Sequence, residues 1–392
     1  MRSGMNCLTD SSVVAALWPG ADLSPRGRGT RYLAGPSVSD PRFLLPADRR
    51  SAESVLRHFR SGGSPSARRR VALLRAALRT TGGWPAVRGV AVDGGRDGDT
   101  IEAWVASLLG PGTSMGIHLG PPRANRKPIL QVLDRDGAPV AVGKVGTSPL
   151  TSRLVATEAT ALGALSAHPV DGVVIPRLLH HGGFHDAGAV LMSYLPLSHA
   201  TGDVDQARLT AAMVSVARAL GTRALPPAEA PWHADLRERA SAIEPAFIRT
   251  ALLRSLDRIG ADREPWELGC WHGDWTAWNA AALGEEVLVW DWERFATDVP
   301  LGWDALHFAL RLDIAGRAPT PDVARTLLER SPRLLAPFGV APQTATSVAA
   351  AYLVELAVRY TADGQRTAGG RSARVEEWVL PVLDALTPGA QP

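Results

Sequence analysis

The apolar pattern of this 392-residue chain divides it into segments that must fold differently. Between about residues 113 and 195, short runs of strand-forming residues alternate with turn signals, among them Asp136-Gly137. From about residue 205 onward the pattern is mostly helical. The predicted strands are Met115–Leu119, Ile129–Leu133, Val140–Val145, Val173–Leu179, Ala189–Leu195 and, in the helical part, Val287–Trp290. A capped helix beginning at Thr151 or Ser152 interrupts the first five strands, which indicates a five-stranded lobe with one helix, followed by a helical lobe.

Residues 1–110 have mixed patterning. We predict short strands at Arg31–Ala34 and Arg42–Leu45 and helices at Ser51–Arg60, Ala67–Thr80 and Thr100–Leu109, the last capped by Asp99. Residues 1–100 contain 16 Arg and 8 acidic residues, a net charge of +8, whereas the remainder has a net charge of −5. A solvated basic surface is the simplest interpretation, and a helix-turn-helix that binds nucleic acid is the alternative.

The composition excludes several classes of protein. Hydrophobic residues make up 45% of the chain and charged residues 21%, as in ordinary globular proteins, which excludes wholesale disorder and collagen. Its two cysteines, Cys7 and Cys270, cannot form a disulfide framework or a four-thiolate zinc site. We expect no transmembrane helix, and the apolar run Val13–Trp18 is too short for a secretory signal, so a cytoplasmic location is expected.

One motif contains residue types and a spacing that suit catalysis. His272-x-Asp274-x4-Asn279 is followed twelve residues later by Asp291, which closes the apolar run Val287–Trp290. Phosphoryl transfer needs a carboxylate that orients the attacking hydroxyl, and oxygen ligands that hold Mg²⁺ on the phosphates. Loop capping is the structural alternative for both aspartates. It is weaker for Asp291, because a carboxylate that ends a buried strand needs a strong partner.

A second pair of residues supplies context for this motif. Only two of the 42 basic residues are lysines, and one of them, Lys144, points to the same strand face as Val140 and Val142. Glu158, fourteen residues later, lies in the apolar stripe of the predicted helix. We predict an ion pair between Lys144 and Glu158 that presents the ammonium to nucleotide phosphates. Two unrelated side chains that extend to solvent are the alternative.

Lys144, Glu158, His272-Gly-Asp-Trp-Thr-Ala-Trp-Asn279 and Asp291-Trp-Glu293, in this order, resemble the aminoglycoside phosphotransferase and choline kinase-like group of small-molecule kinases. The resemblance covers about residues 113–385. It implies an α+β, bilobal protein-kinase-like fold, with a kinase N-lobe at 111–197, a helical C-lobe at 198–392 that carries the catalytic and metal loops, and an N-terminal α/β appendage at 1–110. It also implies ATP or GTP as phosphoryl donor, Mg²⁺ as cofactor and an alcohol group as acceptor.

The resemblance assigns roles by position. Asp274 would be the catalytic base, supported by His272, and Asp304 would brace their loop. The Mg²⁺ ligands would be Asn279 and Asp291. The nucleotide contacts would be Lys144, oriented by Glu158, and a hinge for the adenine at Met192, Ser193, Tyr194 and Leu195.

The sequence departs from the family pattern in the loop Gly120–Pro128, which should lie over the phosphates but lacks G-x-G-x-x-G. Arg123, Arg126 and Lys127 either reach the phosphates there or form a solvated loop. Trp275 and Trp278 either pack in the core or stack on a sugar or aromatic acceptor.

The predicted acceptor is a sugar-containing metabolite or an aminoglycoside-like antibiotic. Three alternatives stay open. The first is a housekeeping kinase for choline, homoserine or a sugar. The second is a catalytically idle kinase-like binding module. The third is a regulator that binds nucleic acid through residues 1–110, although we expect neither a nucleic acid nor a membrane as partner. The sequence does not determine the oligomeric state.

Overall fold

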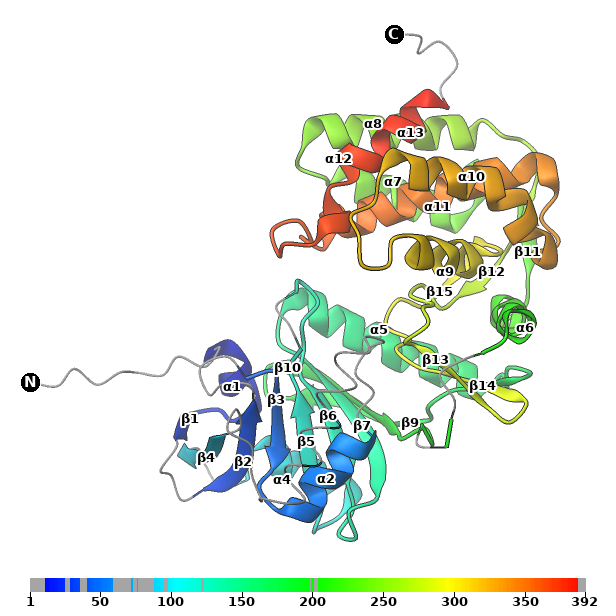
Figure 1. The fold of residues 1–392 in the computed structure, drawn as a ribbon. Coiled ribbons are helices and arrows are strands. Elements are labelled where there is room, and N and C mark those ends of the chain that lie inside the picture. The colour runs from blue at the N-terminus through cyan, green and yellow to red at the C-terminus, as the bar shows by residue number, and fades with distance from the viewer. Residues whose placement is uncertain are drawn as a thin grey trace, which may run out of the picture. The chain divides into compact units, whose positions relative to one another are not determined.

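The computed structural model describes residues 11–24, 29–35, 41–58, 72, 76, 88–94, 98–120, 123–197, 199–200 and 204–386. The chain forms two compact units, and Figure 1 labels their elements. The first unit contains Met1–Thr160 and Pro176–His199, and the second contains Ala161–Ile175 and Ala200–Pro392. The predicted α+β class is confirmed, because a large antiparallel sheet and many helices are both present.

The first unit is built on a nine-stranded antiparallel sheet in the order β1-β4-β2-β3-β5-β6-β7-β10-β9. The strands are β1 (Ala21–Ser24), β2 (Thr30–Gly35), β3 (Phe43–Pro46), β4 (Arg88–Gly94), β5 (Ser114–His118), β6 (Ile129–Leu133), β7 (Pro139–Gly146), β9 (Leu178–Phe184) and β10 (Ala187–Ser193). The helices are α1 (Ser11–Leu17), α2 (Arg49–His58), α4 (Ile101–Leu109) and α5 (Pro149–Ser166), the last of which continues into the second unit.

The strands of residues 1–110 continue the sheet that begins at β5. β3 pairs with β5, with Phe43 opposite His118, so the two segments share one sheet. The predicted strands at Arg31–Ala34 and Arg42–Leu45 are confirmed as β2 and β3, and the helix at Ser51–Arg60 as α2. α2 packs against β3, β5, β6 and β7 (Figure 1). Its apolar residues Ala52, Val55 and Leu56 recur at helical spacing and are buried there.

Of two further predictions for residues 1–110, one needs correction and the other falls mostly on residues that the structure does not describe. The cap of α4 is Thr100, not Asp99, because the Thr100 side chain accepts a hydrogen bond from Ala103 N at 3.2 Å. The predicted helix at Ala67–Thr80, with its three consecutive arginines, lies outside the described residues except for positions 72 and 76. The strands β1 and β4 and the helix α1 were not predicted.

The predicted strand Val173–Leu179 is wrong. It consists of two strands that join different sheets: β8 (Val173–Val174) pairs in parallel with β14, and β9 pairs with β10. Pro176 lies between them and has no N–H to donate to a ladder, which explains why one continuous strand does not form.

The second unit is mostly helical, with two small three-stranded sheets, β11-β12-β15 and β13-β14-β8. Its further elements are α6 (Gln206–Arg218), β11 (Arg223–Leu225), η1 (Pro227–Glu229), α7 (Pro231–Ser241), α8 (Ala246–Gly260), β12 (Trp266–Trp271), β13 (Ala280–Leu283), β14 (Glu286–Val289), β15 (Ala296–Pro300), α9 (Trp303–Asp313), α10 (Pro321–Leu335), η2 (Ala336–Phe338), α11 (Pro342–Ala362), η3 (Arg371–Ala373), α12 (Val375–Trp378) and α13 (Leu380–Ala385). The predicted strand at Val287–Trp290 corresponds to β14, and the other short strands were missed.

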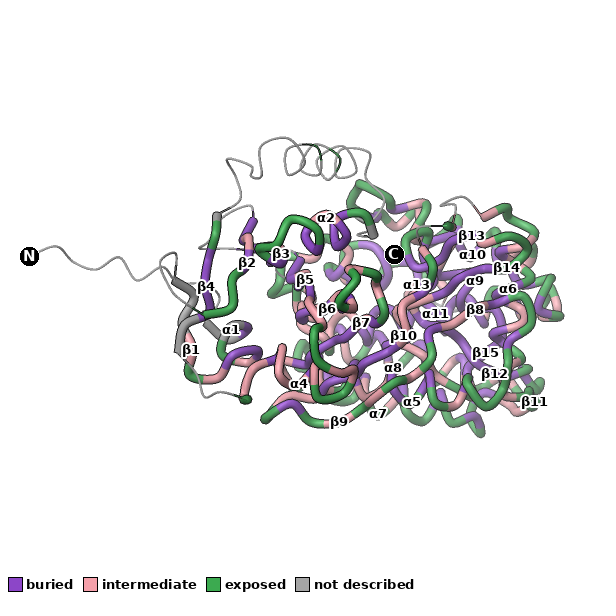
Figure 2. The backbone as a smooth tube through the Cα atoms, turned by 90° about the horizontal axis from the view of Figure 1, so that it is seen from below, coloured by how far each residue is buried: buried purple, intermediate pink, exposed green. Residues whose placement is uncertain are grey.

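Helix α11 forms the centre of the second unit. It packs against α7, α8, α9 and α10, and every residue from Val348 to Arg359 is buried (Figure 2). A helix that is apolar on all sides belongs in a core, and most of this stretch fits that rule. The exceptions are Tyr352, Glu355 and Arg359, whose spacing places them on one face of the helix.

No helix in the described part of the chain is both long enough and apolar enough to cross a membrane.

Hydrogen bonds join the end of α1 and strand β2 to α4, and this contact can be tested. Glu102 accepts hydrogen bonds from Trp18 Nε1 at 3.0 and 2.8 Å and from the Tyr32 hydroxyl. Replacing Glu102 by Ala leaves two buried donors without this acceptor, and we expect the free energy of unfolding to fall by about 1–3 kcal/mol. Urea unfolding measures this change. Arg57→Ala, which removes the pair with Glu53 from its 52% exposed side, is the control and should cost at most about 1 kcal/mol. Equal effects of the two variants would contradict this account.

Candidate active site

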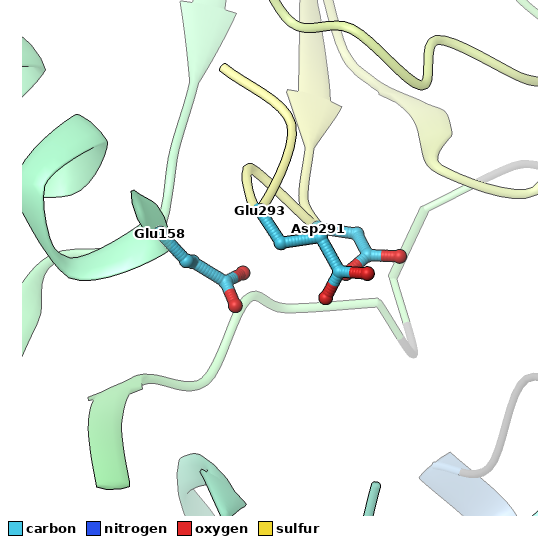
Figure 3. A group of neighbouring side chains, drawn as sticks. All are labelled: Glu158, Asp291 and Glu293. Carbon is cyan, nitrogen blue, oxygen red and sulfur yellow. The ribbon is translucent and has the colours of Figure 1, made fainter. Parts of the chain in front are cut away.

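In the first unit, Lys144 and Glu158 form the predicted ion pair. Lys144 Nζ lies 2.7 Å from Glu158 Oε1 and 2.6 Å from Oε2, and both residues are buried. Strand β7 places Lys144 between Ile129 of β6 and Val190 of β10, and α5 supplies Glu158, which Figure 3 draws. Removing one partner of such a buried pair typically costs about 3–5 kcal/mol, so both residues are tightly constrained.

The second lysine, Lys127, is buried as well, with 8% of its surface exposed. Val145 N donates to Pro128 O at 3.2 Å, which extends the β6–β7 ladder to the end of the loop. Lys127 therefore does not belong to a solvated loop. Arg126 Nε donates to Leu119 O at 3.0 Å, whereas Arg123 is exposed.

The predicted hinge uses some of its backbone donors internally. Ser193 N donates to Arg177 O at 2.8 Å, and Tyr194 N donates to Val140 O at 3.2 Å. In this structure these two N–H groups therefore donate within the protein and not to an adenine ring. Met192 and Leu195 are both buried.

In the second unit, the loop between β12 and β13 carries the His-x-Asp-x4-Asn motif. Gly273 has a φ of +83°, and a Cβ at this position would lie 2.1 Å from Arg294 O. Only glycine satisfies both the positive φ and the close approach. The glycine of the motif thus has a local structural cause.

Asp304, in the first turn of α9, holds this loop. Its carboxylate accepts hydrogen bonds from His272 N at 2.7 Å and from Gly273 N at 3.0 Å. Burial raises the pKa of Asp304 to about 7, while these two donors and the charge of Arg359 act in the opposite direction. The contact is the brace that the resemblance implied.

Arg359 holds the same loop from α11. Its Nη1 donates to Gly273 O at 2.6 Å, and its guanidinium carbon lies 4.8 Å from the centre of the Trp271 ring. Glu355 accepts from Arg359 Nε and Nη2, both at 3.2 Å, and also pairs with Arg239. Asp304 therefore binds the N–H of Gly273, and Arg359 binds its C=O. Neither Arg359 nor Glu355 was predicted from the sequence.

His272 is buried and supports the loop from within. Its Nδ1 accepts from Asp274 N at 3.2 Å, and its Nε2 lies 3.0 Å from Trp290 O. Burial lowers the pKa of His272 to about 4, so the ring is neutral and its Nε2–H donates to the carbonyl. Both ring nitrogens are thus committed to backbone groups.

A β-hairpin brings Asn279 and Asp291 to the same end of a small sheet. Asn279 directly precedes β13, Asp291 follows β14 by two residues, and Trp290 N donates to Asn279 O at 3.2 Å. Asn279 Nδ2 donates to Asp274 O at 2.9 Å and to Asp274 Oδ2 at 3.3 Å. Asp274, Asn279 and Asp291 therefore lie at the same end of the hairpin.

Asp291 occupies a strained backbone position, with a φ of +74°. One carboxylate oxygen of Asp291 and one of Glu293 lie within 4.8 Å of each other, and Figure 3 shows both carboxylates on the loop after β14. Oxygen donors of this kind suit Mg²⁺, which prefers carboxylates and amide oxygens. Glu293, quoted only as part of a motif in the sequence analysis, is a further candidate ligand.

His307 contacts Asp274 directly. Its Nε2 lies 3.1 Å from Asp274 Oδ1, and its Nδ1 lies 3.0 Å from the Tyr352 hydroxyl. Burial acts to raise the pKa of Asp274, but the hydrogen bond from His307 acts in the opposite direction, and the pKa is lowered below its usual range. His307 was not predicted from the sequence. The available signal was its spacing from Asp304, since the two lie three residues apart on α9.

The two tryptophans of the loop differ. Trp275 is fully buried, and its ring packs 5.7 Å from that of His272, so it belongs to the core and the stacking hypothesis does not apply to it. Trp278 is 40% exposed, and the Arg311 guanidinium carbon lies 5.2 Å from the centre of its ring. Trp278 is therefore the candidate for acceptor contact.

No family model matches the sequence, and no curated protein matches it significantly. Solved structures are similar at low identity. The aminoglycoside phosphotransferase APH(4)-Ia, in a ternary complex with ADP and hygromycin B, has 14% identity and a TM-score of 0.46, covering 74% of this chain and 99% of its own. A choline/ethanolamine kinase family protein from Mesorhizobium loti has 14% identity and a TM-score of 0.40, covering 73% and 91%. A glucosamine kinase has 16% identity and a TM-score of 0.36, covering 76% and 86%.

The conformation of Gly273 gives a prediction about stability. Gly273→Ala forces a Cβ against Arg294 O, so we expect the free energy of unfolding to fall by well over 1 kcal/mol. Gly284→Ala is the matched control. Gly284 also has a positive φ, +57°, but no atom of the described residues lies within 4 Å of the place that a Cβ would take there. Chemical unfolding of both variants measures the difference. A cost for Gly273→Ala no larger than that for Gly284→Ala would show that the loop can move aside.

Proposed function

We propose that the protein is a phosphotransferase that moves the terminal phosphoryl group of ATP or GTP to a hydroxyl of a small molecule. The observation that carries the proposal is the arrangement of Asp274. Its carboxylate is held by His307 and Asn279, at the end of the hairpin that also carries Asp291. A fixed carboxylate beside a group of oxygen ligands is what in-line phosphoryl transfer requires.

In the proposed reaction, Asp274 accepts the proton of the acceptor hydroxyl while that oxygen forms a bond to the γ-phosphorus. The bond from the γ-phosphorus to the bridging oxygen breaks, and the nucleoside diphosphate leaves. Lys144, oriented by Glu158, would contact the phosphates of the donor. Held carboxylates and amides reduce the reorganisation that the reaction needs, which lowers its barrier.

The donor set fits Mg²⁺. Asn279 and Asp291 would hold the ion, with Glu293 as a further oxygen ligand, because all three offer hard oxygen donors. When bound, Mg²⁺ neutralises charge that develops on the phosphates. His272 would not move a proton, since both of its ring nitrogens are engaged with backbone groups.

The surroundings of Trp278 favour one kind of acceptor. The exposed ring offers a surface on which a sugar or aromatic ring can stack. The Arg311 guanidinium beside it would repel a polycation, so a neutral or acidic sugar-containing acceptor is favoured over an aminoglycoside.

The test of the function is transfer itself. Wild-type protein with Mg-ATP or Mg-GTP is incubated with neutral sugars, sugar acids, nucleosides, choline-like alcohols and aminoglycosides, and products are detected by mass spectrometry. We expect one acceptor class to gain a phosphoryl group. In Asp274→Asn the rate should fall on the order of 10²–10⁴-fold, because the general base is lost.

Asp298→Asn is the control for this experiment. Asp298 pairs with Arg223 near the surface of the same unit, at 2.7 Å, and its loss should leave the rate unchanged. Nucleotide binding without any product would favour the catalytically idle binding module, whereas transfer that survives in Asp274→Asn would show that Asp274 is not the general base.

Trp278 gives a separate prediction about the acceptor. With the acceptor found in that screen, Trp278→Ala should raise the acceptor KM about 2- to 10-fold, since a lost aromatic stack is worth about 0.5–1.5 kcal/mol. The nucleotide KM should not change. Phe247→Ala, at a ring that is 61% exposed on α8, is the control. Unchanged acceptor KM in Trp278→Ala would place the acceptor elsewhere.

A further inference from the structure

Each carboxylate oxygen of Asp274 meets a donor from a different element. Oδ1 lies 3.1 Å from His307 Nε2 of α9, and Oδ2 lies 3.3 Å from Asn279 Nδ2 at the start of the hairpin. The Asp274 side chain is 35% exposed, whereas that of His307 is only 2% exposed. The partly exposed carboxylate is therefore held against a buried ring.

The ring of His307 is itself fixed by Tyr352 of α11. The Tyr352 hydroxyl lies 3.0 Å from His307 Nδ1, and Tyr352 is fully buried between α9 and its neighbours. Burial raises the pKa of Tyr352 well above its usual value, so the hydroxyl keeps its proton. Burial also lowers the pKa of His307, so the imidazole is neutral.

These two protonation states determine the direction of both hydrogen bonds together with Asp274, whose lowered pKa leaves a carboxylate that can only accept. The Tyr352 hydroxyl donates to Nδ1, which leaves the single imidazole proton on Nε2, and Nε2–H donates to Asp274 Oδ1. Nε2 already carries a proton and has no lone pair for a second one, and a proton added at Nδ1, which accepts from Tyr352, would create a cation in a buried site. His307 is thus suited to holding the carboxylate and not to replacing it as base.

We infer that His307, with its tautomer set by Tyr352, is a positioning residue that fixes the Asp274 carboxylate for attack by the acceptor hydroxyl. The inference rests on the proposed function for the role of Asp274, but the hydrogen-bond chain Tyr352–His307–Asp274 does not depend on it. A carboxylate that rotates away from the productive orientation loses rate, and a misplacement of about 1 Å can cost on the order of 10²-fold.

Two substitutions at His307 separate positioning from general structural support. His307→Gln can place an amide N–H near the position of Nε2, whereas His307→Asn is shorter and can replace only the Nδ1 side, toward Tyr352. We expect kcat to fall on the order of 10²-fold in His307→Asn, with nucleotide and acceptor KM nearly unchanged. His307→Gln should recover most of that loss.

His233→Asn is the matched control. His233 is also buried in the second unit, and its Nε2 lies 2.9 Å from Leu256 O, a backbone atom outside the catalytic loop. It should lower stability without lowering kcat. Equal kcat in His307→Gln and His307→Asn, or a loss of kcat in His233→Asn as large as in His307→Asn, would overturn the inference.

A spectroscopic measurement tests the hydrogen-bond chain without relying on activity. In protein labelled with ¹⁵N-histidine, His307 should show the neutral tautomer protonated on Nε2, with its signals assigned by their absence in His307→Gln. Tyr352→Phe should redistribute the tautomers, and Asp274→Asn should shift the Nε2 signal. A tautomer protonated on Nδ1, or an Nε2 chemical shift that is unchanged in Asp274→Asn, would overturn the inference even in an active enzyme. The predicted signals in a wild-type protein that transfers no phosphoryl group would support the chain and reject the proposed function alone.

Discussion

The arrangement of the candidate site depends on how the Gly273 peptide units are held. Asp304 accepts the N–H groups of His272 and Gly273, and Arg359 donates to the carbonyl of Gly273. A buried backbone turn with a positive φ is stable only when its polar groups are satisfied. These side chains satisfy them, and Asp274, the next residue, is thereby aimed at His307 and Asn279. Loss of this support would misplace every functional group that follows in the loop.

Two helices supply this support through the same spacing. On α9, Asp304, His307 and Arg311 contact the loop backbone, the Asp274 carboxylate and the Trp278 ring in turn. On α11, Tyr352, Glu355 and Arg359 are likewise separated by three and four residues. Tyr352 contacts His307, and Arg359, paired with Glu355, donates to Gly273 O. Residues at these intervals share one helix face, so two rigid elements fix a loop that has little regular structure of its own. The core packing of α11 is thus tied to the geometry of the site.

The sequence was informative where charge interrupts an apolar pattern. Lys144 on a strand and Glu158 in a helical stripe each required a partner, and the ion pair exists. The supporting residues were not predictable in this way, because Arg359 and Gly273 are 86 residues apart, and the face shared by Asp304 and His307 looks like any amphipathic spacing. β13 was missed because its residues Ala280–Leu283 include no β-branched residue, and the division of Val173–Leu179 into β8 and β9 was not predicted because the two strands pair in different sheets.

A crystal structure of the protein with Mg²⁺ and a non-hydrolysable ATP analogue tests the central claim most directly. The account predicts a cation bound by the side chains of Asn279 and Asp291, with the Asp274 carboxylate still held by His307 and free of the cation. A cation bound elsewhere, with Asn279 and Asp291 making no contact to it, would contradict the assignment of this loop and hairpin as the site of phosphoryl transfer.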